Sequence, residues 1–88
     1  MLINFIYKDE LNTITLPSKI EGQYWINFGK QKIISIDGTD NTWHLVSNRK
    51  AKIIDESDNV EKKSLLTVNS LKKIKIGNDI ATIFTEPL

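Results

Sequence analysis

Cysteine is absent from this chain of 88 residues, and histidine occurs once, at His44. A disulfide framework and a thiolate metal site are therefore excluded, and no histidine pair is present to hold a metal ion. The lack of cysteine fits a reducing cytosol. Neither sign of charge dominates, because 12 Lys and Arg are balanced by 11 Asp and Glu. The net charge of +1 does not favour binding to a polyanion such as nucleic acid.

Long hydrophobic runs are also missing. No apolar stretch approaches the roughly 18 residues of a membrane span, so we expect no direct membrane insertion by this segment. The apolar start, residues 1–8, lacks the basic beginning and the small-residue cleavage site of a signal peptide. We interpret it as a first β-strand. The length fits a single domain, residues 1–88.

Strand-forming residues dominate what is present. Isoleucine, valine, threonine and aromatic residues recur with a period of two, which is typical of β-strands, and no helical stripe appears. Eight or nine short strands at about ten-residue spacing predict an all-β fold, an antiparallel β-sandwich. The expected strands are residues 2–7, 11–16, 23–27, 32–36, 41–47, 51–54, 64–68, 73–76 and 80–85, and Val60 stands alone between the acidic loop and residues 64–68.

Turn residues divide these strands. Asp37-Gly38 predicts the start of a tight loop, Gly77-Asn78 predicts a two-residue hairpin turn, and residues 55–59 form an acidic loop. The alternation also predicts a core. Its expected members are Phe5, Ile14, Leu16, Tyr24, Ile26, Ile34, Trp43, Leu45, Ile74, Ile76 and Phe84.

The sequence does not match the known arrangements of catalytic residues that we considered. His44 lies in mid-strand, which is typical of a solvated or half-buried strand residue. The carboxylates lie in turns, and the stretch from Asp55 lacks the glycine and terminal glutamate of a calcium loop. Gly29 is not part of a phosphate-binding loop. We therefore expect a protein that is not an enzyme and that binds no metal and no cofactor.

Single-stranded nucleic acid is an alternative ligand. Small β-barrels bind it with a basic groove and exposed aromatic rings. The candidate residues are Arg49, Lys50, Lys52, Lys72, Lys73 and Lys75, with the aromatic residues Tyr24, Trp25, Phe28 and Trp43. However, Lys73 and Lys75 alternate with isoleucines as on any solvent-facing strand, and Tyr24 and Trp43 fit the core. A partner other than nucleic acid is therefore the preferred expectation.

A family resemblance is carried by several segments in order. They are Gly22-x-Tyr24-x-Ile26, Ile33-Ile34-Ser35-Ile36, Trp43-His44-Leu45, Ser47-Asn48 and the ending Leu71 to Phe84, with Gly77-Asn78-Asp79-Ile80. This order resembles a forkhead-associated (FHA) domain, of the SMAD/FHA type. The resemblance implies a sandwich of about eleven strands that reads phosphothreonine peptides through loops at one end.

A narrower resemblance covers nearly the whole chain. Its segments are Leu16-Pro17-x-Lys19-Ile20-x-Gly22-x-Tyr24-Trp25-Ile26, Asp37-Gly38, Trp43-x-Leu45-x-Ser47-Asn48 and Ile83-Phe84-Thr85-Glu86-Pro87. They resemble the N-terminal segment of the FtsK-type membrane ATPases of type VII secretion in Firmicutes. This implies that the chain is the first domain of a longer protein, held at the cytoplasmic face of the cell membrane through its membrane-associated parent.

The departures from the FHA pattern weaken its phosphate chemistry. Asn27-Phe28 stands where the family has Gly-Arg, whose arginine contacts phosphate. The supporting histidine is missing too. The resemblance leaves Ser47, Asn48 and Arg49 as the protein-binding residues, with Arg49 as a substitute for the lost arginine.

We therefore expect a non-catalytic protein-interaction domain that docks a secretion component, a substrate or a sister domain without strict phosphothreonine dependence. Its contacts are expected from the loops at residues 27–30, 37–41 and 47–50, because loops on a rigid sandwich commonly carry binding. Two alternatives stay open. One is a phosphothreonine-peptide reader, and the other is the nucleic-acid binder described above.

Overall fold

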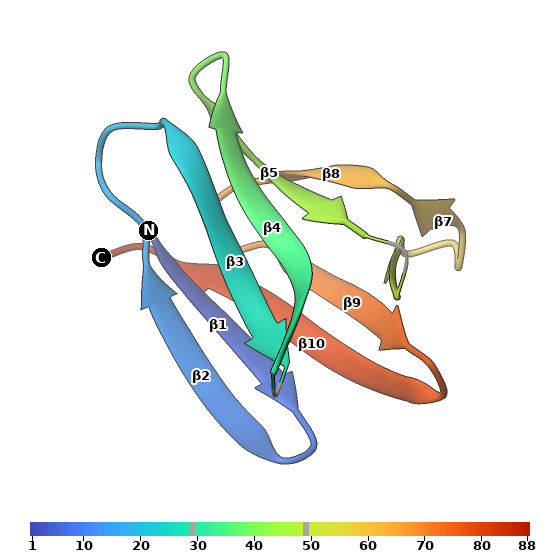
Figure 1. Cartoon of the computed structure of the whole chain (residues 1–88). Coiled ribbons are helices and arrows are strands. Elements are labelled where there is room, and N and C mark those ends of the chain that lie inside the picture. The colour runs from blue at the N-terminus through green and yellow to red at the C-terminus, as the bar shows by residue number, and fades with distance from the viewer. Residues whose placement is uncertain (29, 49) are drawn as a thin grey trace.

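The computed structural model describes residues 1–28, 30–48 and 50–88 of the chain. The described residues form ten strands and no helix (Figure 1). The strands are β1 (Leu2–Tyr7), β2 (Glu10–Thr15), β3 (Gly22–Phe28), β4 (Gln31–Thr39), β5 (Thr42–Ser47), β6 (Ala51–Ile54), β7 (Val60–Glu61), β8 (Lys63–Leu66), β9 (Leu71–Ile76) and β10 (Asp79–Glu86).

Two antiparallel sheets pack against each other. One sheet has six strands in the order β2-β1-β10-β9-β6-β7, and the other has four in the order β3-β4-β5-β8. Figure 1 shows β3 and β4 lying across β1 and β10, the first and last strands, which pair as the second and third strands of the larger sheet. The predicted all-β antiparallel sandwich is confirmed.

Between the sheets lies one apolar core that draws on both. Seven of the residues expected there are buried, and Ile14, Tyr24 and Ile76 pack against it while partly exposed. Phe84 was predicted wrongly. It is paired with Asn4 and Leu71 on the outer face of the larger sheet, while its neighbours Ile83 and Thr85 point inward. The buried hydrophobic residues are Ile3, Phe5, Leu16, Ile26, Ile34, Ile36, Trp43, Leu45, Ala51, Ile53, Leu66, Ile74, Ala81 and Ile83.

One turn lies further along the chain than the sequence predicts. Asp37 and Gly38 pair with residues of both β3 and β5, so β4 continues through them to Thr39. The chain reverses at Asp40 and Asn41, whose φ values of 52° and 61° suit a tight hairpin turn. Asp and Asn tolerate the left-handed conformation better than other non-glycine residues. Asp40-Asn41 therefore indicates this turn better than Asp37-Gly38 does.

Several of the predicted boundaries agree with the structure. Strands at residues 2–7 and 51–54 begin and end as expected. Gly77 starts the predicted hairpin between β9 and β10 with a φ of 61°, a conformation that costs glycine little. The acidic loop at residues 55–59 joins β6 to β7.

Candidate binding site

Ser47 is the last residue of β5, and its side chain is bound to the main chain. Its backbone N–H donates to the carbonyl of Lys62 over 3.0 Å, and its Oγ donates to the same oxygen over 3.3 Å. Lys62 lies where the chain leaves β7 in the larger sheet and enters β8 in the smaller one. Ser47 therefore fixes the end of β5 to this crossing point.

Asn48 joins the loop after β5 to the beginning of β4 at the same end of the sandwich. Its Nδ2 donates to the carbonyl of Lys32 over 2.7 Å, and its Oδ1 accepts from the backbone N–H of Lys50 over 2.9 Å. The second bond is a local turn of the kind that asparagine often makes. The amide keeps one hydrogen and one lone pair for a ligand. Asn48 thus tethers the loop after β5 to β4, besides any role it has in binding.

Arg49, the third residue expected in the site, lies outside the described residues. The structure does bring two of the three expected binding loops together, because Asn48 bridges residues 47–50 to the start of β4 near residues 27–30. The loop at residues 40–41 lies at the other end of β4, nine residues away along that strand. The loops therefore do not form one three-part surface.

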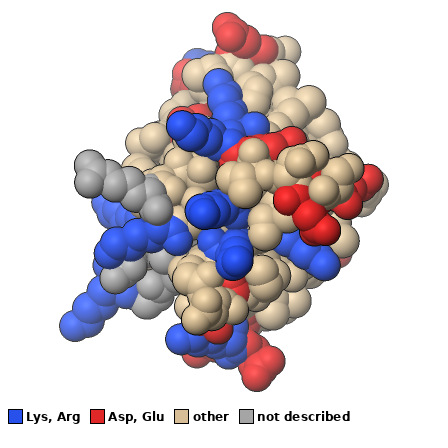
Figure 2. All heavy atoms as spheres, turned by 90° about the vertical axis from the view of Figure 1, so that its right-hand side faces the viewer, with Lys and Arg blue, Asp and Glu red and all other residues tan. Residues whose placement is uncertain are grey.

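Exposed lysines surround Ser47 and Asn48. Lys32 and Lys62 supply the two carbonyls just described, Lys50 follows in the loop, and Lys63 is paired with Val46 beside Ser47. We call this surface the basic loop end, defined by Lys30, Lys32, Lys50, Lys62 and Lys63, all of them exposed. Figure 2 shows Lys and Arg side chains gathered at the centre and left of one face of the molecule, with acidic side chains at its right.

Within the described part of the chain, no lysine of the basic loop end makes an ion pair. Among the described residues, the ion pairs are Lys8 with Asp79 at 3.9 Å and Lys19 with Glu21 at 3.4 Å. Neither involves a lysine of this end. The sequence did not reveal the cluster, because its members come from three segments separated by whole strands. These lysines come together because the start of β4, the end of β5 and the start of β8 lie at the same end of the smaller sheet.

The aromatic residues are divided between the core and the surface. Tyr24 and Trp43 meet edge to face inside the sandwich, with ring centroids 5.8 Å apart. Trp25 lies on the outer face of the smaller sheet, half-buried, and the Nζ of Lys32 lies 5.9 Å from its ring centroid. The side chain of Phe28 is outside the described part of the chain. Trp25 thus lies against a lysine of the basic loop end.

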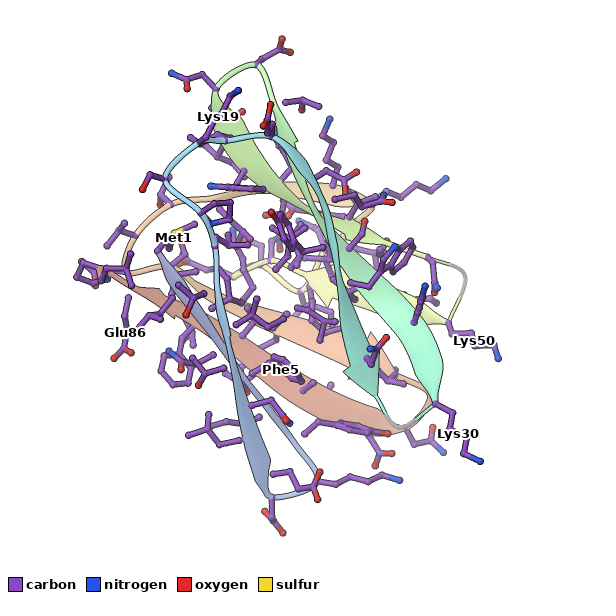
Figure 3. The ribbon with its side chains drawn as sticks, turned by 60° about the vertical axis from the view of Figure 1, so that its left-hand side comes forward. Met1, Phe5, Lys19, Lys30, Lys50 and Glu86 are labelled. Carbon is purple, nitrogen blue, oxygen red and sulfur yellow. The ribbon has the colours of Figure 1, made fainter. Side chains whose placement is uncertain are left out.

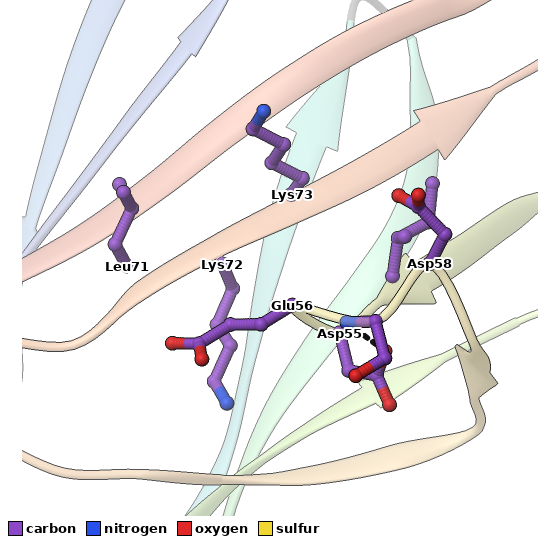
Figure 4. Close-up of a pocket in the computed structure, with 8 residues that line it drawn as sticks. Asp55, Glu56, Asp58, Leu71, Lys72 and Lys73 are labelled. Atoms are coloured by element: carbon purple, nitrogen blue, oxygen red, sulfur yellow. Dashed lines mark hydrogen bonds between the residues drawn. The ribbon is translucent and has the colours of Figure 1, made fainter.

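A hollow of about 580 Å³ lies between the acidic loop and the start of β9. Figure 4 shows the carboxylates of Asp55, Glu56 and Asp58 pointing apart from one another. The carboxylate of Asp55 is used within its own loop. Its Oδ1 accepts hydrogen bonds from the backbone N–H groups of Ser57 and Asn59, each over 2.8 Å. These acids thus serve the turn and do not converge on a common point. The lining residues are Ile54, Asp55, Glu56, Ser57, Asp58, Leu71, Lys72 and Lys73.

Two buried polar atoms lack a hydrogen-bond partner within the described structure. They are Nδ1 of His44 and Oε2 of Glu61. His44 is a half-buried residue on the outer face of β5, whereas Glu61 is paired with Ile53 in the larger sheet. The two groups belong to different sheets and do not form an acid–base pair. No group of three or more potential metal ligands occurs in the parts of the chain that the structure covers.

Comparison of the chain with protein-family models, curated proteins and solved structures finds no match. In residues 1–28, 30–48 and 50–88, no helix has the length and apolar character needed to cross a membrane.

Proposed function

We propose that this chain is a non-catalytic protein-interaction domain that docks an acidic segment of a partner protein at the basic loop end. The supporting observation is the group of exposed lysines around Ser47 and Asn48, none of which makes an ion pair within the described residues. Like charges held together repel one another, and an acidic partner relieves that repulsion while being steered to the site.

The FHA class is proposed on the order of the sequence motifs. The sandwich of ten strands in two sheets agrees with the architecture that this resemblance implies. The host is proposed on the sequence resemblance alone: the chain is the N-terminal domain of a type VII secretion ATPase of Firmicutes, at the cytoplasmic face of the membrane. Its partner is then a secretion component, a substrate or a sister domain.

Recognition at this site does not depend strictly on phosphothreonine. Lysines offer mobile point charges, whereas an arginine grips phosphate with a rigid fork of donors. Asn27-Phe28 replaces the Gly-Arg pair, and the amide of Asn48 is already engaged by Lys32 and Lys50. A run of Asp or Glu side chains fits such a surface, because each carboxylate can pair with a separate lysine.

An NMR titration tests the proposal. The ¹⁵N-labelled chain is titrated with a Glu/Asp-rich peptide and, as a control, with its Gln/Asn counterpart. Only the acidic peptide is expected to shift amide resonances of Lys32, residues 47–50 and Lys62. The shifts should weaken as salt rises, because exposed charge pairs are screened over about 8–10 Å at moderate ionic strength. No shift at these amides contradicts the proposal.

Lysine variants locate the site. Lys50→Ala and Lys62→Ala are each expected to weaken the acidic peptide about two- to fivefold, the range for loss of an exposed charge pair. Lys19→Ala is the matched control. Figure 3 shows Lys19 at the far end of the sandwich from Lys30 and Lys50. Equal weakening by Lys19→Ala would mean that overall charge, and not this site, attracts the peptide.

The second candidate is phosphothreonine reading, which the position of Asn48 among lysines favours. The same titration includes a phosphothreonine peptide and the matching glutamate peptide. Binding of the phosphopeptide more than about tenfold tighter would replace the leading proposal with this one. A labelled single-stranded oligonucleotide covers the remaining alternative, for which affinity should fall steeply with salt.

A further inference from the structure

The two sheets end in four edge strands, β2, β7, β3 and β8. Three of them are protected against pairing with another chain. β7 has only two residues, β8 has four and begins with Lys63, and β3 has a register shift between Ile26 and Asn27. Short length, lysine and bulges are the usual devices that keep sheet edges apart.

β2 has none of these protections. It spans six residues, Glu10–Thr15, without proline or lysine, and its pairing with β1 has no register shift. Five of the six residues are exposed, and Leu11 is 61% exposed. The segment 11–15 is uncharged. An edge of this length without a bulge, uncharged over residues 11–15, is a template for another strand.

The hydrogen-bonding register identifies the backbone groups that β2 presents outward. The N–H of Leu16 donates to the carbonyl of Met1 over 2.9 Å, just beyond the pair of Leu2 with Thr15. Because hydrogen-bonded and non-hydrogen-bonded pairs alternate in an antiparallel ladder, the backbone groups of Leu11, Thr13 and Thr15 point away from β1. They form the open half of a ladder centred on Thr13.

We propose that β2 pairs with β2 of a second copy of this chain, in an antiparallel dimer whose twofold axis passes beside Thr13. In this register Thr13 faces Thr13 of the second copy, and Leu11 faces Thr15. The strand is self-complementary, because no pair in segment 11–15 brings like charges together. The two six-stranded sheets then form one continuous sheet. The proposal is independent of the basic loop end.

Sedimentation velocity over a wide range of protein concentration tests the dimer. The wild-type chain is expected to move from monomer to twice that mass as concentration rises. Thr13→Lys and Thr13→Glu place like charges against each other on the axis, and each alone should weaken association about tenfold. An equimolar mixture of the two variants should recover a heterodimer, because Lys then faces Glu.

Thr13→Gln is the matched control. All three variants lose the bond from Thr13 Oγ1 to Asn4 Oδ1, 2.8 Å long, but Gln adds no charge and should dimerise like the wild type. Circular dichroism verifies that each variant folds. If the position 13 variants do not fold, the double variants Leu11→Lys/Thr15→Lys and Leu11→Glu/Thr15→Glu repeat the test, because each sets like charges at positions 11 and 15 against each other, whereas their mixture pairs Lys with Glu. A wild-type monomer at every concentration, or a mixture no heavier than either charged variant alone, overturns the proposal.

Discussion

At the scale of single residues, Gly38 occupies the tightest position among the three glycines that the structure describes. A Cβ at this position would lie 2.8 Å from the backbone N of Glu21 and 2.9 Å from Cζ3 of Trp43. The chain before β3 therefore packs directly on the C-terminal end of β4, and the absent side chain makes room for it. This explains why a Gly within a strand, read from the sequence as a loop, is compatible with pairing on both sides.

Gly38→Ala is expected to destabilise the fold by about 1–3 kcal/mol, because the added methyl forces backbone and ring to shift. Urea unfolding measures the loss, and the native fluorescence of Trp43 should change with it. Thr39→Ala, on the exposed next residue of the strand, is the control and should stay within about 0.5 kcal/mol of the wild type. A Gly38→Ala variant as stable as this control contradicts the close packing.

Core membership in β10 illustrates what composition can and cannot reveal. Size and hydrophobicity favoured Phe84, but the inward residues are Ala81, Ile83 and Thr85. Thr85 is buried because its Oγ1 accepts from the N–H of Ser70, 2.8 Å away, and donates to the carbonyl of Thr67. The alternation of inward and outward residues along β10 was therefore predicted correctly, but the residues assigned to the inward face were wrong. A hydroxyl can take a core position when turn groups satisfy it, and no local pattern indicates that.

At the scale of strands, the period of two and the turn residues predicted nearly every element. The core phase of β3 and β5 was also predicted, since Ile26, Trp43 and Leu45 are buried. At β4 the predicted end of the strand was wrong, because Asp37-Gly38 was taken as the turn in place of Asp40-Asn41. Glycine can mark either a turn or a close approach of backbone, and here it marks the second.

Like charges face each other across β6 and β9. Lys52 is paired with Lys75, and both are exposed. Lys52→Glu replaces repulsion by attraction and is expected to stabilise the fold by about 0.5–1 kcal/mol in urea unfolding at low salt. The gain should shrink at about 0.5 M salt, where screening is strong. Lys52→Gln, which only removes the repulsion, should gain less.

A Lys52→Glu variant no more stable than wild type at low salt would show that the two ammonium groups avoid each other. Lys52 and Lys75, together with Lys73 on the same outer face, then behave as separate solvated charges. The sequence separates Lys52 from Lys75 by more than twenty residues, so strand register is needed to see this pair.

At the scale of the whole molecule, the candidate site is a product of topology. Ser47 and Asn48 are binding-site candidates proposed from the sequence, whereas their bonds to Lys62 and Lys32 were not predicted. Neighbours of this kind depend on which strand ends meet, and the order β3-β4-β5-β8 decides that. The net charge of +1 does not indicate the basic loop end, because acidic residues elsewhere on the molecule balance the charge of its lysines.

The chain ends lie side by side. Leu2 is paired with Glu86, and Figure 1 shows the N and C labels close together. A short glycine linker from Leu88 to Met1 can therefore close the chain without strain, and new ends can be opened between Glu56 and Ser57 in the exposed acidic loop. This circular permutant preserves every strand.

The permutant is expected to fold with a loss of about 1–2 kcal/mol, mainly from the hydrogen bonds of Asp55 to Ser57 and Asn59. Urea unfolding and an NMR spectrum with native-like dispersion measure the outcome. A control permutant with the same linker but opened between Phe5 and Ile6 should not fold, because β1 lies between β2 and β10. Failure of the first permutant, or folding of the second, would contradict the central role of the β1–β10 pairing. Success of the first alone would show that this pairing, and not the order in which the chain is synthesised, defines the sandwich.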